Sequence, residues 1–487
     1  MKNCMGTHYQ NIDRPSSLAA IACSAVFLIA GGCGSRRPVV DVPDAAARAI
    51  GEAGLIRFDP RGAPIDMPGD TPDMLSAPLA VRLALISDPA IQQALARVRA
   101  AEADADQSRL LPNPVLNFSY LFRQHQAAYI TLGLDTDLLS YLLRPRQISI
   151  ADNRLRAAAA DALAVVLKSL AEVQEQYAAV QALDARLQVL AERRKIIEQL
   201  LHVGEARLNI GEGTRLDVLT LDTQRVALDA QIQSRTLDRI NARLALARII
   251  GRPSGRADWR VSPWQPSRIV VSDEQRWVRA ALINRPEMQA GRWELAALGD
   301  QAALARFAAW EGTQLGPESE RDTVWAVGPA LTVPLPIFDQ GQAKLKKARS
   351  NQIEARHKLT QISRQVVEEV RRAYQTFAAS QKALRQMTGE LLPLQELRRA
   401  QAQRAYRAGE ADLATFLLAE QDLQTARELL VDVQQKSSVA LFELQRTVGG
   451  PAVAARLEAP APATGPATAT VSAAQAADGP ATSLRVH

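Results

Sequence analysis

The spacing of apolar residues divides the chain into long helical runs and short alternating runs. One helical run begins near Pro145 and continues to about His202, and its apolar residues, such as Leu163, Val166 and Leu170, recur every three or four positions. This spacing places them on one narrow stripe of a helix and is typical of a coiled coil. A second run of the same kind extends from about residue 340 to 406. The pattern therefore predicts a mainly α fold built on very long helices.

Each long run ends at a glycine, after which another helical run follows. The two glycines are Gly211 and Gly409. Glycine just past a helix end tolerates the left-handed conformation that closes the helix. Thr214 lies three residues before Asp217, which fits a new N-cap with an acidic residue at the third helical position. We predict two long antiparallel helical hairpins whose tips lie at these glycines.

Between the helical runs, apolar and polar residues alternate with a period of two, which predicts β-hairpins. One hairpin is predicted at about 116–134, and the second half has a weaker strand at about 310–316, a polar turn at 317–321 and a strand at 324–333. The apolar faces of these strands carry Phe118, Tyr120, Ile130, Leu132, Trp325 and Val327. The alternation alone does not decide whether these faces meet a protein core or membrane lipid.

The two halves of the chain are a tandem repeat. The sequence Val-Arg-x-Ala-Leu-Ile beginning at Val81 recurs 197 positions later at Val278, and the two tip glycines lie 198 positions apart. Agreement at several separated places indicates a duplication. The predicted division is a first repeat at 78–252, a linker at 253–272, a second repeat at 273–450 and a disordered tail rich in Ala, Pro and Thr at 451–487.

The N-terminus has the pattern of an export signal. Lys2 and Arg14 precede a short apolar run, and small residues then lead to Cys33. This predicts a signal peptide over residues 1–32, and the apolar run is too short to span a membrane. Small residues before a cysteine resemble the bacterial lipoprotein signal, so Cys33 is predicted to be a lipid anchor, with ordinary cleavage nearby as the alternative. Residues 33–77 are predicted to be extended because Pro and Gly interrupt any period.

Composition excludes several classes of function. The net charge of +6 is spread along the chain without a basic block, which argues against nucleic-acid binding. All three cysteines fall in the first 33 residues, and the five histidines are scattered without the spacing of metal ligands. No G-x-S-x-G, Walker A or H-E-x-x-H motif is present. We expect neither an enzyme nor a bound cofactor or metal.

The order of elements resembles the TolC-type outer-membrane efflux factor family. The residues that carry this resemblance are Leu111-Pro112-Asn113-Pro114, the stretch from Val333 to Gly341, and the two tips. Members of that family are trimers in which each chain contributes four strands to one twelve-stranded outer-membrane β-barrel. Their helices continue the barrel as a tunnel across the periplasm, and the tunnel closes at the tips. The resemblance implies the same homotrimer here, with the apolar strand residues named above facing lipid.

The resemblance also assigns roles to residues of the tips. Four of them correspond to the turns that dock on a periplasmic adaptor protein: Gly211, Thr214, Gly409 and Glu410. Asp217 and Tyr406 correspond to residues of the network that holds the aperture shut. From the residues alone, Asp217 is equally well explained as a helix cap, and Tyr406 as packing between helices.

An oligomer is also expected on physical grounds. Four strands cannot close a barrel, because the smallest bacterial single-chain barrels have eight. An unclosed sheet in lipid would leave backbone groups unpaired, at several kcal/mol each. Three chains supply enough strands to close the barrel.

The expected function is a passive, lipid-anchored exit channel of the outer membrane that extends into the periplasm. It would export drugs, metals or other small molecules in a tripartite system with an adaptor and an inner-membrane pump of the resistance-nodulation-division or ABC type. Two alternatives stay open: an exit duct for type I protein secretion, and a periplasmic coiled-coil scaffold lipoprotein without a pore. A scaffold has no need of amphipathic strands, so the strands discriminate against it.

Overall fold

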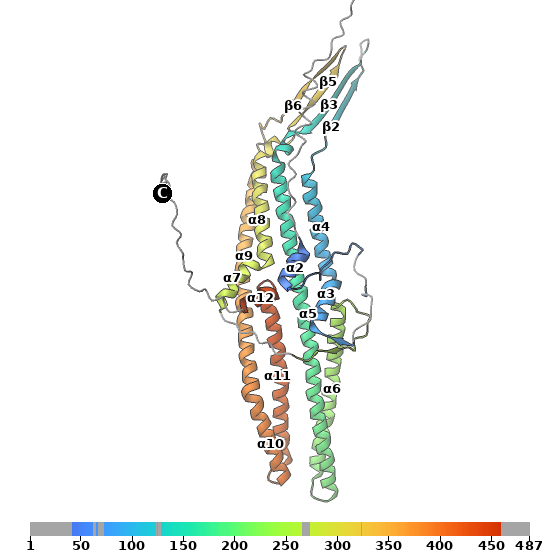
Figure 1. Ribbon diagram of the computed structural model, residues 1–487, viewed down its shortest axis with the longest axis vertical. Helices are drawn as coiled ribbons and strands as arrows, with labels where there is room; N and C mark the ends of the chain where they lie inside the picture. Colours follow the sequence, from blue (N-terminus) through green and yellow to red (C-terminus); the bar gives the residue numbers. More distant parts are fainter. Residues whose placement is uncertain are drawn as a thin grey trace, which may run out of the picture.

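The computed structural model describes residues 41–61, 65–66, 73–122, 124, 128–264, 273–322 and 324–458. The molecule is elongated, with a small sheet at one end and the tips of two helical hairpins at the other (Figure 1). The predicted signal peptide, the predicted lipid anchor Cys33 and the tail beyond Glu458 lie outside the described residues.

The first repeat has the predicted order of helix, hairpin, long helix, tip and long helix. Its elements are α3 (Ala77–Ser87), α4 (Pro89–Arg109), β2 (Val115–Leu121), β3 (Tyr129–Asp137), α5 (Leu138–Asn209) and α6 (Arg215–Ile249). With 72 residues, α5 is about 110 Å long at 1.5 Å per residue. Its predicted seam is buried, including Leu163, Val166, Leu170 and Val173, which confirms that this stripe packs against other parts of the molecule.

The second repeat follows the same plan. Its elements are α7 (Glu274–Asn284), α8 (Pro286–Leu304), the 3₁₀ helix η1 (Ala305–Trp310), β5 (Gln314–Arg321), β6 (Trp325–Thr332), α9 (Gln342–Gln386), the π turn η2 (Met387–Leu391), α10 (Leu392–Ala408) and α11 (Leu413–Thr447). The duplication and the mainly α fold are therefore confirmed.

The four strands of the two repeats form one antiparallel sheet in the order β2-β3-β5-β6. Both β2 and β6 are edge strands with one unpaired side. The linker between the repeats contributes β4 (Arg260–Val261), which pairs in parallel with β1 (Met74–Leu75). Tyr177 holds this small sheet against α5, because its hydroxyl donates to the carbonyl of Leu75 and accepts from the N–H of Ser262, both at 2.9 Å.

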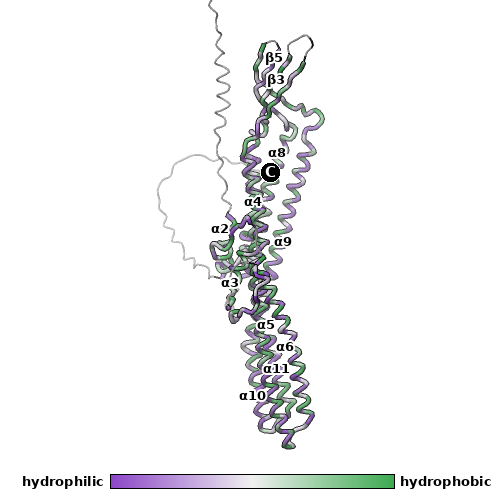
Figure 2. Tube along the Cα trace, turned by 90° about the vertical axis from the view of Figure 1, so that its right-hand side faces the viewer, coloured by the Kyte–Doolittle hydropathy of each residue, from purple (hydrophilic) through white to green (hydrophobic). Residues whose placement is uncertain are grey.

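Each repeat has its own apolar cluster midway along the molecule. The first joins α2 (Val42–Ile50) with α3, α4 and α5 through residues such as Leu85, Ile91 and Val166. The second joins α7–α9 and α11 through residues such as Trp277 and Phe377. Outside these clusters, hydrophilic and hydrophobic positions alternate along the long helices and strands (Figure 2). No helix among the described residues combines the length and apolar character needed to cross a membrane.

Several predicted boundaries were wrong, each because of a proline. The helix α5 begins at Leu138, where Asp137 caps it by accepting from the N–H of Ser140 at 3.1 Å, and Pro145 lies inside it. The single helices predicted before each hairpin break at Pro89 and Pro286. Proline disfavours the helical conformation in the residue before it, so that residue becomes the N-cap of α4 or α8.

Three further segments differ from the prediction. The predicted turn at 317–321 is part of β5, and Pro317 lies where the β3–β5 pairing passes from Gly133–Glu318 to Thr136–Leu315. Proline lacks the N–H that a central ladder needs. The predicted extended segment contains the helix α2 (Val42–Ile50), capped by Asp41. The predicted tail begins with the helix α12 (Pro451–Glu458), which buries Val453 and Ala454 in the second apolar cluster.

Candidate functional site

The two hairpin tips close with the same backbone geometry. At the first tip, the N–H groups of Glu212 and Gly213 donate to the carbonyl oxygen of Arg207 at 2.9 and 3.1 Å. The second tip repeats both bonds 198 positions later, onto the carbonyl oxygen of Ala405, at 2.9 and 3.3 Å. The duplication therefore extends to individual hydrogen bonds, and each tip presents a tight backbone turn at the end of the molecule (Figure 1).

Glycine is needed at the tips for two different reasons. Gly211 and Gly409 have φ angles of +80° and +76°, in the left-handed region, and a Cβ atom added to either would meet nothing within 4 Å. A Cβ at Gly213 would lie 2.9 Å from the backbone nitrogen of Leu208. In the first tip a Cβ at Gly213 would therefore force the turn to shift, and the sequence interpretation missed this close approach. The available signal was a second glycine two residues after Gly211.

The helices that follow the two tips, α6 and α11, are both capped by a threonine and an aspartate. The N-cap is the threonine in α6 and the aspartate in α11. Thr214 caps α6, and its hydroxyl accepts from the N–H of Asp217 at 3.1 Å while the Asp217 carboxylate accepts from the N–H of Thr214 at 3.3 Å. Asp412 caps α11 and accepts from the N–H of Thr415 at 2.9 Å. The hydroxyl and then the N–H of Thr415 hold the pKa of Asp412 below its usual value. In this chain Asp217 is a helix cap.

Tyr406 is the tip residue that joins the two hairpins. The guanidinium of Arg207, from the first hairpin, lies 5.5 Å from the centre of the Tyr406 ring and donates to its hydroxyl at 3.4 Å. The Tyr406 ring also stacks on Phe416, with the ring centres 5.8 Å apart. Arg399 covers Phe416 in turn at 5.9 Å. Among the described residues, no hydrogen bond links Tyr406 to Asp217.

The inner end of this stack is fixed by a buried ion pair. Arg399 donates to Glu420 at 2.9 Å, and Glu420 is only 2% exposed. Gln424, which is fully buried, donates to the other carboxylate oxygen at 2.8 Å. A paired and hydrogen-bonded buried carboxylate holds its neighbours in one arrangement. At the other end of the stack, Arg207 is half-buried, and among the described residues no side-chain ion pair holds its guanidinium.

Two further arginines join the hairpins above the tips. Arg186 of α5 pairs with Asp432 of α11 at 2.5 Å and also donates to Gln435 at 3.0 Å. Arg427 of α11 pairs with Glu192 of α5 at 3.1 Å. These pairs are partly exposed, so each contributes little to stability alone. Together with Arg207 they connect the hairpins at three levels.

At the opposite end, the register of the sheet brings the predicted apolar residues onto one face. Directly paired residues of neighbouring strands point to the same side of a sheet. Phe118 pairs with Leu132, Leu132 with Ser319, and Ser319 with Val327. The next row consists of Tyr120, Ile130, Arg321 and Trp325. All six residues predicted for the apolar face therefore share one side, and Phe118, Trp325 and Val327 are at least half exposed.

The other side of the sheet is polar. Its rows contain Asn117, Ser119, Thr131, Glu318 and Glu320, interspersed with glycines. The Asn117 amide donates to Asp135, and the Tyr129 hydroxyl donates to Glu320. The sheet thus separates an apolar surface from a hydrogen-bonded polar surface.

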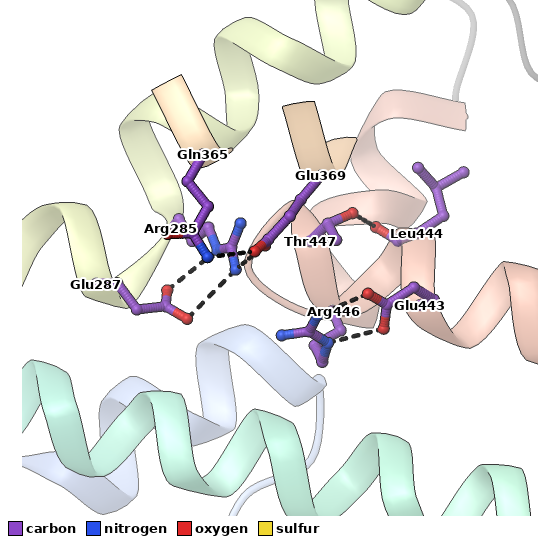
Figure 3. Close-up of polar contacts among 8 residues, drawn as sticks. All are labelled: Arg285, Glu287, Gln365, Glu369, Glu443, Leu444, Arg446 and Thr447. Atoms are coloured by element: carbon purple, nitrogen blue, oxygen red, sulfur yellow. Dashed lines mark hydrogen bonds and ion pairs between the residues drawn. The ribbon is translucent and has the colours of Figure 1, made fainter. Parts of the chain in front are cut away.

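A buried ionic network lies midway along the second repeat (Figure 3). Arg285, which is 5% exposed, pairs with Glu369 at 2.5 Å and with Glu287 at 3.1 Å. Burial alone would raise the pKa of Glu369, but bonds from Arg285 and Gln365 outweigh it and lower the pKa. In the first repeat the equivalent of Arg285 is Asp88, an ordinary N-cap. The network holds α8 against α9 and is structural.

Within the described parts of the chain, no group of three or more His, Cys, Asp or Glu side chains is placed to hold a metal ion.

Comparison with known proteins agrees with this geometry. The family model described as "Outer membrane efflux protein" matches residues 80–252 and 277–450, one match for each repeat. No curated protein sequence matches the chain significantly.

Solved structures share the fold. The outer membrane protein VceC from Vibrio cholerae superposes with a TM-score of 0.64 at 20% identity, covering 77% of this chain and 96% of that one. The outer-membrane channel OprN gives 0.64 at 20% identity, with 87% and 99% covered. The open state of the MtrE outer membrane channel of Neisseria gonorrhoeae gives 0.64 at 17% identity, with 77% and 89% covered.

Proposed function

The chain belongs to the outer membrane efflux protein family, and on this premise we propose that it is the passive exit channel of a tripartite efflux system. One observation carries the proposal. A single chain has a two-faced sheet at one end and, at the far end of helices such as the 72-residue α5, two tips of matching geometry. The sheet suits the outer membrane, and the tips suit contact with partners in the periplasm.

The channel is a homotrimer. The edge strands β2 and β6 each leave one row of backbone groups unpaired, and in lipid each such group costs several kcal/mol. Pairing β6 of one chain with β2 of the next removes all edges once three chains have closed the barrel. The apolar face with Phe118, Leu132 and Val327 then meets lipid, and the polar face with Asn117 and Thr131 lines the lumen.

The tips dock on a periplasmic adaptor, which connects the channel to an inner-membrane pump. Gly211 and Gly409 leave open space beside the backbone, since an added Cβ would meet nothing within 4 Å. Thr214 and Glu410 lie beside them on the same exposed turns. A partner can therefore approach the backbone of both turns closely. The pump belongs to either the resistance-nodulation-division or the ABC class and supplies the energy for transport. The channel itself performs no bond chemistry.

The stack around Tyr406 holds the aperture closed. Arg207 is its one member from the first hairpin, and it contacts the ring and the hydroxyl of Tyr406. Separating the hairpins therefore breaks this contact first and leaves the ion pair of Arg399 and Glu420 intact. An adaptor that binds the separated arrangement more tightly shifts the population toward the open channel.

The anchor in this proposal is Cys33, which would be acylated after removal of residues 1–32. A single acyl chain gives only marginal membrane binding, so the barrel remains the main attachment to the membrane.

Reconstitution tests the proposal. The full chain is expressed in a bacterium from which its own efflux exit channel has been deleted, and the purified protein is examined for mass and for conductance in planar bilayers. We expect trimers that conduct, and restored efflux when the matching adaptor and pump are present. A monomer without conductance would refute the channel, and conductance combined with export of a protein substrate only would favour the secretion duct.

A further inference from the structure

One charged side chain lies on the mainly apolar face of the sheet. The rows of this face contain Thr136, Leu315 and Leu331, then Leu116, Leu134, Pro317 and Pro329, then Phe118, Leu132, Ser319 and Val327, and finally Tyr120, Ile130, Arg321 and Trp325. Arg321 is the one charged residue among them. A lone charge on a face proposed to meet lipid needs a counter-charge.

Arg321 is held in a defined place. It pairs directly with Trp325 across the β5–β6 ladder, and its guanidinium carbon lies 5.8 Å from the centre of the Trp325 ring. An aromatic ring covers one face of a guanidinium and leaves the N–H groups on its edge free to donate. The neighbouring Glu320 points to the opposite side of the sheet, where it accepts a bond from Tyr129. Within the described strands, no carboxylate pairs with Arg321 across this face.

The height of Arg321 on the sheet identifies its surroundings. From the row of Leu331 to the row of Trp325, β6 rises about 20 Å at about 3.4 Å per residue. The lipid-facing apolar band of outer-membrane barrels is about 25 Å tall and is bordered by aromatic residues. Trp325 is the first residue of β6 and Tyr120 is next to the last residue of β2. Both therefore lie at the end of the sheet that is farthest from the helices, as the course of these strands shows (Figure 1). Arg321 therefore lies where the hydrocarbon ends and the headgroups begin.

We propose that the Arg321 guanidinium, backed by Trp325, binds the phosphate of an anionic lipid headgroup at the outer rim of the sheet. The inference rests on the proposed function, because it requires this face to meet lipid. A guanidinium fork matches a phosphate with two parallel N–H···O bonds. A lipid, unlike free phosphate, also covers the apolar rows beneath with its acyl chains. A trimer carries three such sites.

Quenching of Trp325 fluorescence by brominated lipids tests the site. The full trimer is reconstituted in vesicles with brominated phosphatidylglycerol or brominated phosphatidylcholine, and the signal of Trp325 is obtained by subtracting that of Trp325→Phe. One basic side chain near a membrane surface favours anionic lipid by about fivefold. We expect the anionic lipid to quench Trp325 with about fivefold preference. Arg321→Gln should reduce that ratio to about one, and Arg321→Lys should keep part of it.

The control is Arg349→Gln, which removes the same group from an exposed position on α9 and should leave the preference unchanged. Equal quenching of the wild type by both lipids, or a preference that survives in Arg321→Gln, would overturn the inference. Loss of the preference when inorganic phosphate is added would show a general anion site and would overturn the assignment to lipid. Absence of quenching by either lipid would instead contradict the proposed membrane contact of the sheet.

Discussion

Removing the Arg207 side chain should release the contact that we propose to keep the aperture closed. The substitution Arg207→Ala deletes the cation–π contact with Tyr406 at 5.5 Å and the hydrogen bond at 3.4 Å. It leaves Tyr406 stacked on Phe416, and it does not touch the capping bonds of either tip. The fold of each hairpin should therefore be preserved.

The expected change in the open-to-closed ratio follows from the contact between Arg207 and Tyr406, which occurs three times in the proposed trimer. A cation–π contact at a partly exposed site contributes about 0.5–1 kcal/mol, and a 3.4 Å hydrogen bond adds little. Three copies give about 1.5–3 kcal/mol, which corresponds to a change of about 10- to 150-fold in the ratio of open to closed channels. A change of this size is large for gating and small for the stability of a long helical trimer.

Single-channel recording of the purified trimer, without adaptor, measures this ratio directly. We expect Arg207→Ala to spend a larger fraction of time conducting. Arg407→Ala is the matched control, because it removes the same side chain from the exposed position of α10 next to Tyr406. Tyr406→Phe retains the ring and should give a smaller effect. If Arg207→Ala and Arg407→Ala conduct alike, the stack does not hold the aperture, and if Arg207→Ala conducts less, the contact belongs to the open channel.

Four further predictions test other parts of the molecule. Gly409→Trp should cost only about 1–2 kcal/mol of backbone strain, so trimers should form while adaptor co-purification and efflux are lost; Gly409→Asn, which tolerates the left-handed conformation, should retain both. Leu132→Arg should lose about 2–4 kcal/mol at the lipid face and reduce assembled trimer, whereas Thr131→Arg should assemble and change conductance, and equal tolerance would contradict a membrane wall. Cys33→Ser should abolish labelling with radioactive palmitate but leave the protein in the outer membrane, and continued labelling would disprove the anchor. Asp161 is exposed, but partial desolvation and then the charge of Glu287 raise its pKa, so its ionised form disfavours folding at neutral pH. Asp161→Asn should therefore raise the melting temperature slightly at pH 7, and a gain that persists below the pKa of the carboxyl group would point to another cause.

Periodicity and local turn chemistry were enough to predict the long helices, the hairpins and the tips. These features depend on residues close in sequence, such as the seam through Leu163 and Val166 or the capping pair of Thr214 and Asp217. The errors occurred where proline allowed two outcomes. Pro145 was predicted to start a helix, but the helix begins earlier, after its cap at Asp137. Pro317 was predicted to lie in a turn, but it lies within β5, at a gap in the pairing of β3 with β5.

The contacts between the repeats were beyond the reach of local patterns. Arg207 and Tyr406 are 199 positions apart, and nothing in the spacing around either residue indicates its partner. Arg321 was likewise assigned to a polar turn, because only the register with Trp325 and Ile130 places it on the apolar face. Sequence repeats predict that two halves share a fold, but they do not predict how the halves meet.

The duplication has a consequence for the proposed docking of an adaptor on the tips. Both tips offer the same backbone hydrogen bonds, yet their caps exchange threonine and aspartate, and Gly213 of the first tip corresponds to Ala411 of the second. In the proposed trimer, tips of the two kinds alternate around the aperture. An adaptor that recognises the shared backbone can bind at every tip, whereas side-chain contacts separate the two kinds. The contact of Arg207 with Tyr406 joins one tip of each kind, so in the proposed gating the channel opens by separating tips of the two kinds.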